Sequence, residues 1–95
     1  MIKSFGDKEL EKCWYHGDCR KINAKLKNRI LIKLDWIDAA TCIDDLQNPP
    51  SNHLHKLTGN YEGYWAISIN GPWRLIFQFE ESDAYDVQLV QYHSH

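Results

Sequence analysis

The amino-acid sequence predicts one α+β domain in which a short strand and two helices pack on a small, twisted antiparallel sheet. The 95 residues leave room for a single domain, covering residues 1–95. Apolar residues recur at helical spacing in the first half of the chain, whereas apolar and polar residues alternate in the second half, as they do in strands. Asn70-Gly71 separates two of the alternating runs and is a strong signal for a hairpin turn.

The first half is expected to contain the short strand and both helices. Residues 2–5 form the predicted strand, and an acidic N-cap is expected to begin a helix at 7–14. The strongest helical signal spans residues 21–37, where apolar positions are three or four residues apart. These positions form one face: Ile22, Leu26, Ile30, Leu34 and Ile37. Residues 38–46 are expected to form a loop with one further helical turn.

The second half is expected to form an antiparallel meander. Asn-Pro-Pro-Ser-Asn at 48–52 interrupts regular structure, and candidate strands follow it. They span residues 53–57, 64–69, 73–79 and 84–92. In the run 73–79, Trp73, Leu75 and Phe77 point to one face, which leaves Arg74 on the opposite face. The helices are expected to bury their apolar face against one side of this sheet.

The N-terminal residues and the cysteines indicate the compartment. The first residues carry charges where a signal peptide requires an apolar run, and no stretch approaches the roughly 20 apolar residues of a membrane span. Cytoplasm is therefore the expected compartment. Three cysteines without C-x-x-C spacing suggest neither a disulfide framework nor a zinc ribbon. Cys13, Cys19 and Cys42 are expected to be free thiols, buried or incidental rather than catalytic.

One local surface of the predicted fold is basic. The formal net charge of −2 argues against a general nucleic-acid coat protein. Lys21, Lys25, Arg29 and Lys33 nevertheless step by four residues along the predicted helix and form a cationic stripe. Like charges at this spacing destabilise an isolated helix by roughly a few tenths of a kcal/mol per pair. The stripe is either a solvated face or a surface that meets a polyanion, such as ribosomal RNA or the phosphates of a substrate.

Six motifs, in order along nearly the whole chain, resemble the HigB toxins of the RelE superfamily, the plasmid maintenance killer family of type II toxin–antitoxin systems. They are Met-Ile-Lys-Ser-Phe at 1–5, Leu-Asp-x-x-Asp-Ala-Ala-Thr at 34–41, Leu-His-x-Leu-x-Gly at 54–59, Gly-Tyr-Trp-x-Ile-Ser at 63–68, Trp-Arg-Leu-x-Phe-x-Phe at 73–79, and Asp-Ala-Tyr-Asp-Val at 83–87 leading to Tyr92-His93. The resemblance implies a RelE-like fold and metal-independent cleavage of mRNA in the ribosomal 30S A site, which inhibits translation. The cationic stripe is then expected to bind the ribosome.

The same resemblance implies the partners and the residues of the site. A HigA-type helix-turn-helix antitoxin is the expected partner; no cofactor, no membrane and no direct DNA binding except through the antitoxin are expected. Cleavage needs a base for the 2′-hydroxyl, an acid for the departing 5′-oxygen, a cation for the phosphorane and a ring that holds the nucleobase. The resemblance implies His55 and His93 as base and acid, in either order. It implies Arg74 as the cation and Tyr92 as the ring.

Two residues depart from the family pattern, although both are still expected to contact RNA or phosphate. Gln91 stands where relatives commonly have aspartate, and an amide cannot carry a proton or hold a histidine as an anion would. Relatives often have a lysine at the position of Thr58, whereas this chain has its lysine two residues earlier, at Lys56. On a strand, positions 56 and 58 point to the same face.

Three other interpretations stay open. Arg74 could pair with Glu80 or Asp86 rather than with RNA. The pairs His53-x-His55 and His93-x-His95 could chelate zinc, because positions i and i+2 of a strand point to one side. Finally, the chain could be a catalytically weak or inactive RelE-like module that binds the ribosome or the antitoxin without cutting RNA.

Overall fold

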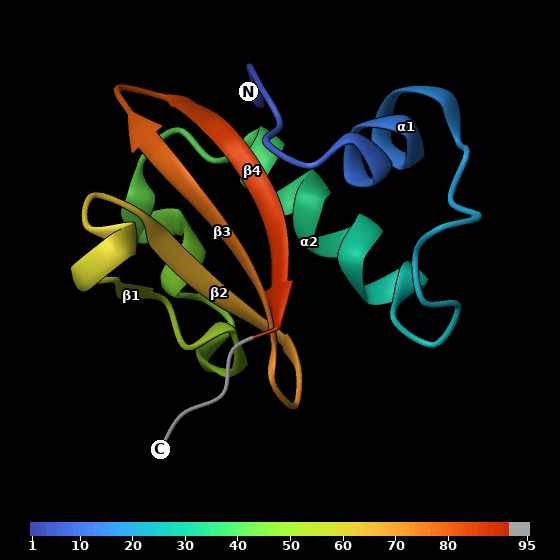
Figure 1. The fold of residues 1–95 in the computed structure, drawn as a ribbon. Helices are drawn as coiled ribbons and strands as arrows, with labels where there is room; N and C mark the ends of the chain where they lie inside the picture. Colours follow the sequence, from blue (N-terminus) through green and yellow to red (C-terminus); the bar gives the residue numbers. More distant parts are fainter. Residues whose placement is uncertain (92–95) are drawn as a thin grey trace.

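The computed structural model describes residues 1–91 and shows two layers, with α1 and α2 on one face of an antiparallel sheet (Figure 1). The helices are α1 (Lys8–His16) and α2 (Lys27–Ala39). The strands, in their order in the sheet, are β1 (His55–Lys56), β2 (Trp65–Asn70), β3 (Trp73–Glu80) and β4 (Asp83–Gln91). Short 3-10 helices are η1 (Ile43–Gln47), η2 (Pro50–Asn52) and η3 (Gly59–Tyr61). The predicted α+β class is confirmed.

Capping residues define both ends of α1. The Oδ1 atom of Asp7 accepts hydrogen bonds from the backbone N–H groups of Glu9 and Leu10, at 3.1 and 3.2 Å, which satisfies two donors that the first helical turn leaves free. The helix ends at Gly17, whose φ of 68° is the left-handed conformation that glycine adopts without steric cost. The helix predicted at 7–14 is therefore confirmed, and it extends to His16.

The second helix begins later than its apolar periodicity predicts. Residues 20–26 form turns, and α2 starts only at Lys27. Asn23 explains the delay, because its side-chain oxygen accepts from the N–H of Lys25 at 2.9 Å and its backbone oxygen accepts from Leu26. Such local bonds offer the backbone an alternative to the helix. The predicted stripe is thus divided, with Lys21 and Lys25 before α2 and the two later cations within it.

The core lies between α2 and the sheet. Ile30, Leu34 and Ile37 of α2 are fully buried. They belong to one apolar cluster with fully buried residues of the central strands, among them Ile67 and Phe77. This arrangement confirms the predicted burial of the helices against one side of the sheet. No helix within residues 1–91 is long and apolar enough to span a membrane.

Of two predicted edge strands, one is absent and the other is shorter than expected. Residues 2–5 form no strand; Ile2 and Phe5 make only isolated parallel bridges to β4. Asp86 of β4 has a φ of 54° at a register shift, and such a bulge bends the strand away from continuous pairing. At the other edge, the strand predicted at 53–57 is reduced to His55–Lys56. His53 has a φ of 47°, which is incompatible with a strand.

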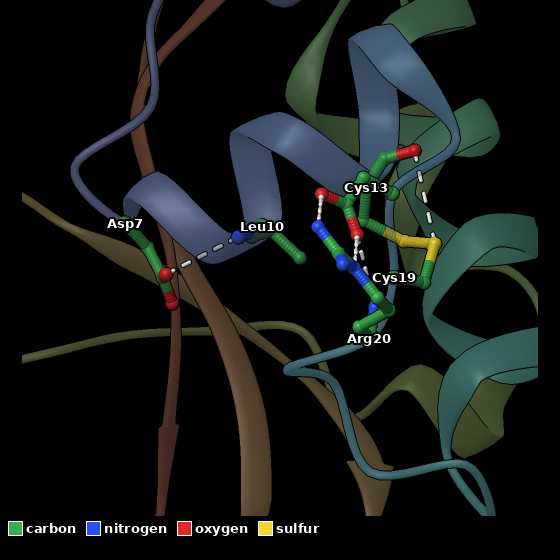
Figure 2. Close-up of a disulfide and its surroundings, with 6 residues drawn as sticks. Asp7, Leu10, Cys13, Cys19 and Arg20 are labelled. Atoms are coloured by element: carbon green, nitrogen blue, oxygen red, sulfur yellow. Dashed lines mark hydrogen bonds and ion pairs between the residues drawn. A yellow bond between two sulfur atoms is a disulfide. The ribbon is translucent and has the colours of Figure 1, made fainter.

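Cys13 and Cys19 form a disulfide, so the prediction of free thiols is wrong for this pair (Figure 2). The chain reverses at Gly17, where the N–H of Asp18 bonds back to the carbonyl of Lys12 at 3.2 Å. This reversal brings the two Cα atoms to 4.3 Å. The sequence argument failed because an odd number of cysteines excludes complete pairing but not one pair. Cys42 is a free thiol, as expected, and it is exposed.

Reduction of the Cys13–Cys19 bond should lower the free energy of unfolding by about 2 kcal/mol, because the bond restricts a short loop in the unfolded chain. Urea unfolding with and without dithiothreitol measures the effect. Cys19→Ser should abolish the response to reductant, and the matched variant Cys42→Ser should retain it. Identical wild-type unfolding curves in both conditions would contradict the assignment of the bond.

Candidate functional site

Two predicted catalytic residues, His55 and Arg74, share the face of the sheet that points away from the helices, here called the open face. His55 of β1 pairs with Ala66 of β2, and Arg74 of β3 pairs with Ser68 of β2. Directly paired residues share a face, and positions two apart on β2 share it as well. Strand geometry places the Cα atoms of His55 and Arg74 roughly 12 Å apart. A substrate could therefore contact both residues.

The hairpin between β2 and β3 holds the guanidinium of Arg74. Its Nη1 atom donates to the backbone oxygens of Gly71 and Trp73, at 2.5 and 3.0 Å. Its Nε atom is buried and has no hydrogen-bond partner within residues 1–91. Within residues 1–91, Arg74 forms no salt bridge with Glu80 or Asp86, the two carboxylates predicted as possible partners. Asp86 instead accepts a hydrogen bond from the hydroxyl of Tyr64, so donors of Arg74 remain available for a ligand.

Beside Arg74 lies a cleft with a volume of about 500 Å³, here called the basic cleft. α2, the chain around η2, and the β2–β3 hairpin form its walls. Its lining consists of Arg29, Lys33, Ser51, His53, Ser68, Ile69, Asn70, Gly71 and Arg74. Three of these side chains are cations, and the lining contains no carboxylate. The basic cleft therefore has a concentrated positive charge in a protein whose net charge is negative.

Two cations of α2, Lys33 and Arg29, form hydrogen bonds with the far end of β2. The Nζ atom of Lys33 donates to the carbonyl of Ser68 at 2.6 Å, and Nη1 of Arg29 donates to the carbonyl of Ile69 at 3.4 Å. Lys33 is only 7% exposed. Burial, and then the neighbouring charge of Arg29, lower the pKa of the Lys33 ammonium below its ordinary value.

The side chains of His55 and Lys56 differ in their surroundings. The Nδ1 atom of His55 lies 2.7 Å from the backbone oxygen of His53. Because an oxygen accepts, Nδ1 carries the proton and Nε2 of a neutral ring is left as an acceptor. Lys56 points to the opposite face, with its Nζ atom 5.4 Å from the ring centroid of Trp65. The structure therefore does not bring Lys56 together with His55 and Arg74.

The end of β4 lies next to Arg74. Gln91, the last described residue, pairs with Trp73, and its neighbour Val90 pairs with Arg74. Because paired residues share a face, Gln91 lies on the face of Trp73, opposite to Arg74, and the structure does not bring these two predicted site residues together. Tyr92 and His93, the predicted stacking ring and second histidine, lie outside the described residues.

The backbone around His53 removes the geometric basis for a zinc site at the His53-x-His55 pair. His53 adopts a left-handed conformation before β1, so it is not at position i of a strand that continues through His55. Residues 1–91 contain no group of three or more histidine, cysteine, aspartate or glutamate side chains that could hold a metal ion. The other pair, His93-x-His95, lies outside the described residues.

The sequence did not predict Ser51 at this site, it suggested His53 only as a zinc ligand, and it assigned Arg29 and Lys33 to the ribosome-binding stripe. Ser51 and His53 carry no local signal, because they reach the basic cleft only through the fold of the η2 region. Arg29 and Lys33 do carry a local signal in the sequence. They are separated by one helical turn, and no acidic residue lies between them to neutralise their charge.

Comparison with known proteins identifies the family. Residues 3–93 match the family described as RelE-like toxin of type II toxin-antitoxin system HigB. The chain belongs to this family. It is 41% identical to the Endoribonuclease HigB of Proteus vulgaris over 93 residues, which cover 98% of this chain and 100% of that protein. It is 37% identical to Toxin HigB-1 of Vibrio cholerae over 91 residues, covering 94% of this chain and 95% of that protein. These relationships confirm the predicted family and support endoribonuclease activity.

Solved structures show the same fold at low sequence identity. YafQ from E. coli superposes with a TM-score of 0.67 at 15% identity, covering 96% of this toxin and 91% of YafQ. A YoeB–YefM complex from Staphylococcus aureus contains a chain that superposes with a TM-score of 0.57 at 21% identity, covering 99% of this toxin and 97% of that chain. The predicted RelE-like fold is therefore confirmed.

Lys33 of this HigB-like toxin should lose its proton at a lower pH than a lysine in the unfolded chain, because its pKa is lowered. Between the lowered pKa and about 10.4, the unfolded chain binds more protons, so stability should rise as pH increases through this window. Arg29→Gln should raise the Lys33 pKa only part of the way, because burial is the larger cause. Heteronuclear NMR of the lysine Cε and Nζ atoms against pH measures both effects. Titration of Lys33 at the ordinary value for lysine would contradict the burial argument.

Proposed function

We propose that this toxin is a cytoplasmic, ribosome-dependent endoribonuclease that cleaves mRNA in the A site of the 30S subunit without a metal or another cofactor. Family membership and the named activity of the Proteus relative support the proposal. The observation that carries it in the structure is the position of His55 and Arg74 on the open face, next to the end of β4. This face could receive a single RNA strand.

In the proposed reaction, the 2′-oxygen of the substrate attacks the adjacent phosphorus. His55 takes the proton of the 2′-hydroxyl through Nε2, because its Nδ1–H is already bonded to the carbonyl of His53. Arg74 neutralises the charge that grows on the non-bridging oxygens. His93 protonates the departing 5′-oxygen, and Tyr92 stacks on a nucleobase. The bond to the 5′-oxygen breaks as the bond to the 2′-oxygen forms, which leaves a 2′,3′-cyclic phosphate and a 5′-hydroxyl.

The proposed partners follow from the type II toxin–antitoxin family. A HigA-type antitoxin holds the toxin inactive, and DNA is reached only through the antitoxin. Lys21 and Lys25, which lie before α2, contact ribosomal RNA. In the cytoplasm, the Cys13–Cys19 bond would be exposed to thiol reductants, since disulfides persist mainly in oxidising compartments.

Purified toxin, added to ribosomes stalled with a defined codon in the A site, should cut the mRNA, and His55→Ala should slow the cut by about 10²-fold or more, since it removes the general base. Primer extension maps the RNA ends. Naked mRNA serves as the control for ribosome dependence. His16→Asn is the control for loss of a histidine, because His16 is exposed at the end of α1 and does not line the basic cleft.

The second candidate function is binding without cleavage, and Gln91 in place of the family aspartate favours it. A toxin that binds ribosomes but leaves the mRNA intact would support this alternative. Unchanged cleavage by His55→Ala would instead overturn the assignment of His55 as the base.

Replacing Gln91 with aspartate should raise the apparent pKa of the catalytic acid, because an anion near an imidazole favours its protonated form. The alkaline limb of the pH–rate profile should move to higher pH. Gln91→Asn, which changes the side chain without adding charge, is the matched control. An unshifted profile for Gln91→Asp would show that position 91 does not act on the titrating group.

A further inference from the structure

The basic cleft is a built site rather than an accidental group of surface charges. Arg29 and Lys33 come from α2, and Arg74 comes from β3, so three cations converge from two layers of the fold. No carboxylate lines the cleft, and none of the three cations forms a salt bridge within the described chain. Converging like charges raise the energy of the folded protein unless an anion neutralises them.

Each cation keeps hydrogen-bond donors that the protein itself does not use. Lys33 has three N–H donors, and one of them forms the hydrogen bond to the carbonyl of Ser68. The two bonds of Arg74 both come from Nη1, so the donors of Nη2 have no partner within residues 1–91, whereas the unpartnered Nε atom is buried. Several cationic donors that face a cleft of about 500 Å³ match the oxygens of a phosphate group.

Arg74 connects the basic cleft to the open face. It lines the cleft, yet through its pairing with Ser68 it also shares the open face with His55. An RNA strand whose reacting phosphate contacts Arg74 on the open face would therefore pass the mouth of the cleft with its next phosphate.

We propose that the basic cleft binds the backbone phosphate adjoining the cleaved one, through Arg29 and Lys33 on α2. The proposal rests on the proposed function for the identity of the strand, which is mRNA. It separates Arg29 and Lys33 from Lys21 and Lys25, so one half of the cationic stripe holds the substrate and the other half contacts ribosomal RNA.

The test is binding of a short, single-stranded 2′-O-methyl RNA that cannot be cut, measured by fluorescence anisotropy over a range of salt concentrations. Arg29→Gln with Lys33→Gln should weaken binding about tenfold or more at low salt. The slope of log Kd against log salt should fall by about 0.7 for the one lost phosphate contact. The matched control is Lys3→Gln with Lys8→Gln, which removes the same charge at exposed positions outside the cleft. This control should leave the slope unchanged.

Further arms separate the alternatives. Arg29→Gln alone changes an exposed residue, so it should remain folded even if loss of the buried Lys33 destabilises the protein. Equal slopes for wild type and Arg29→Gln, or no binding of the RNA by wild type at low salt, would overturn the proposal. Weakened affinity of the cleft variants for empty ribosomes, with unchanged binding of the RNA, would assign the cleft to ribosomal RNA instead. A protein that binds the uncut RNA through the cleft but never cleaves mRNA would refute the proposed activity and leave the cleft assignment intact.

Discussion

The packing of α2 on the sheet is the interaction on which the rest of the structure depends. Ile30, Leu34 and Ile37 are fully buried in the cluster shared with the central strands, and each contributes on the order of 1.5–3 kcal/mol. An α-helix has 3.6 residues per turn, so burial of this face also determines where the other faces point. Arg29 and Lys33 consequently lie on the flank of α2 next to the end of β2. Rotation of α2 to free these cations would expose the apolar face.

The short β1 strand explains why cations occupy that place. β1 pairs only with the beginning of β2, at Trp65 and Ala66. Carbonyl groups near the other end of β2 therefore need donors that a longer strand would supply. Lys33 and Arg29 provide these donors from the helix layer. A cation that satisfies a carbonyl retains further N–H groups, so the same side chains can complete the sheet and face a ligand.

Arg74 joins two regions with different properties. The open face carries an exposed histidine whose ring orientation is set by a backbone carbonyl, which suits proton transfer. The basic cleft collects charge without a carboxylate, which suits binding of an anion. A single strand of RNA would use both regions, since its phosphates are regularly spaced and its reacting hydroxyl lies beside one of them. The negative net charge of the chain is compatible with this arrangement, because the local distribution of charge determines where a polyanion binds.

Local signals in the sequence were sufficient for much of the fold. The Asp7 cap located α1, and Asn70-Gly71 with the alternating runs located the β2–β3 hairpin, because a few neighbouring residues determine these features. Family motifs placed His55 and Arg74 among the candidate residues, and the alternation of β3 correctly put Arg74 on the face opposite the core.

Other features were decided only by the tertiary structure. The late start of α2 depends on a turn at Asn23 that competes with a favourable apolar period, and the Cys13–Cys19 bond depends on the reversal after α1. The basic cleft brings together α2, the η2 region and the hairpin, which are distant along the chain. Periodicity shows which residues share one element, but it contains no information on which elements meet. Packing of the apolar faces determines which elements meet, and it places Arg29 and Lys33 beside Arg74.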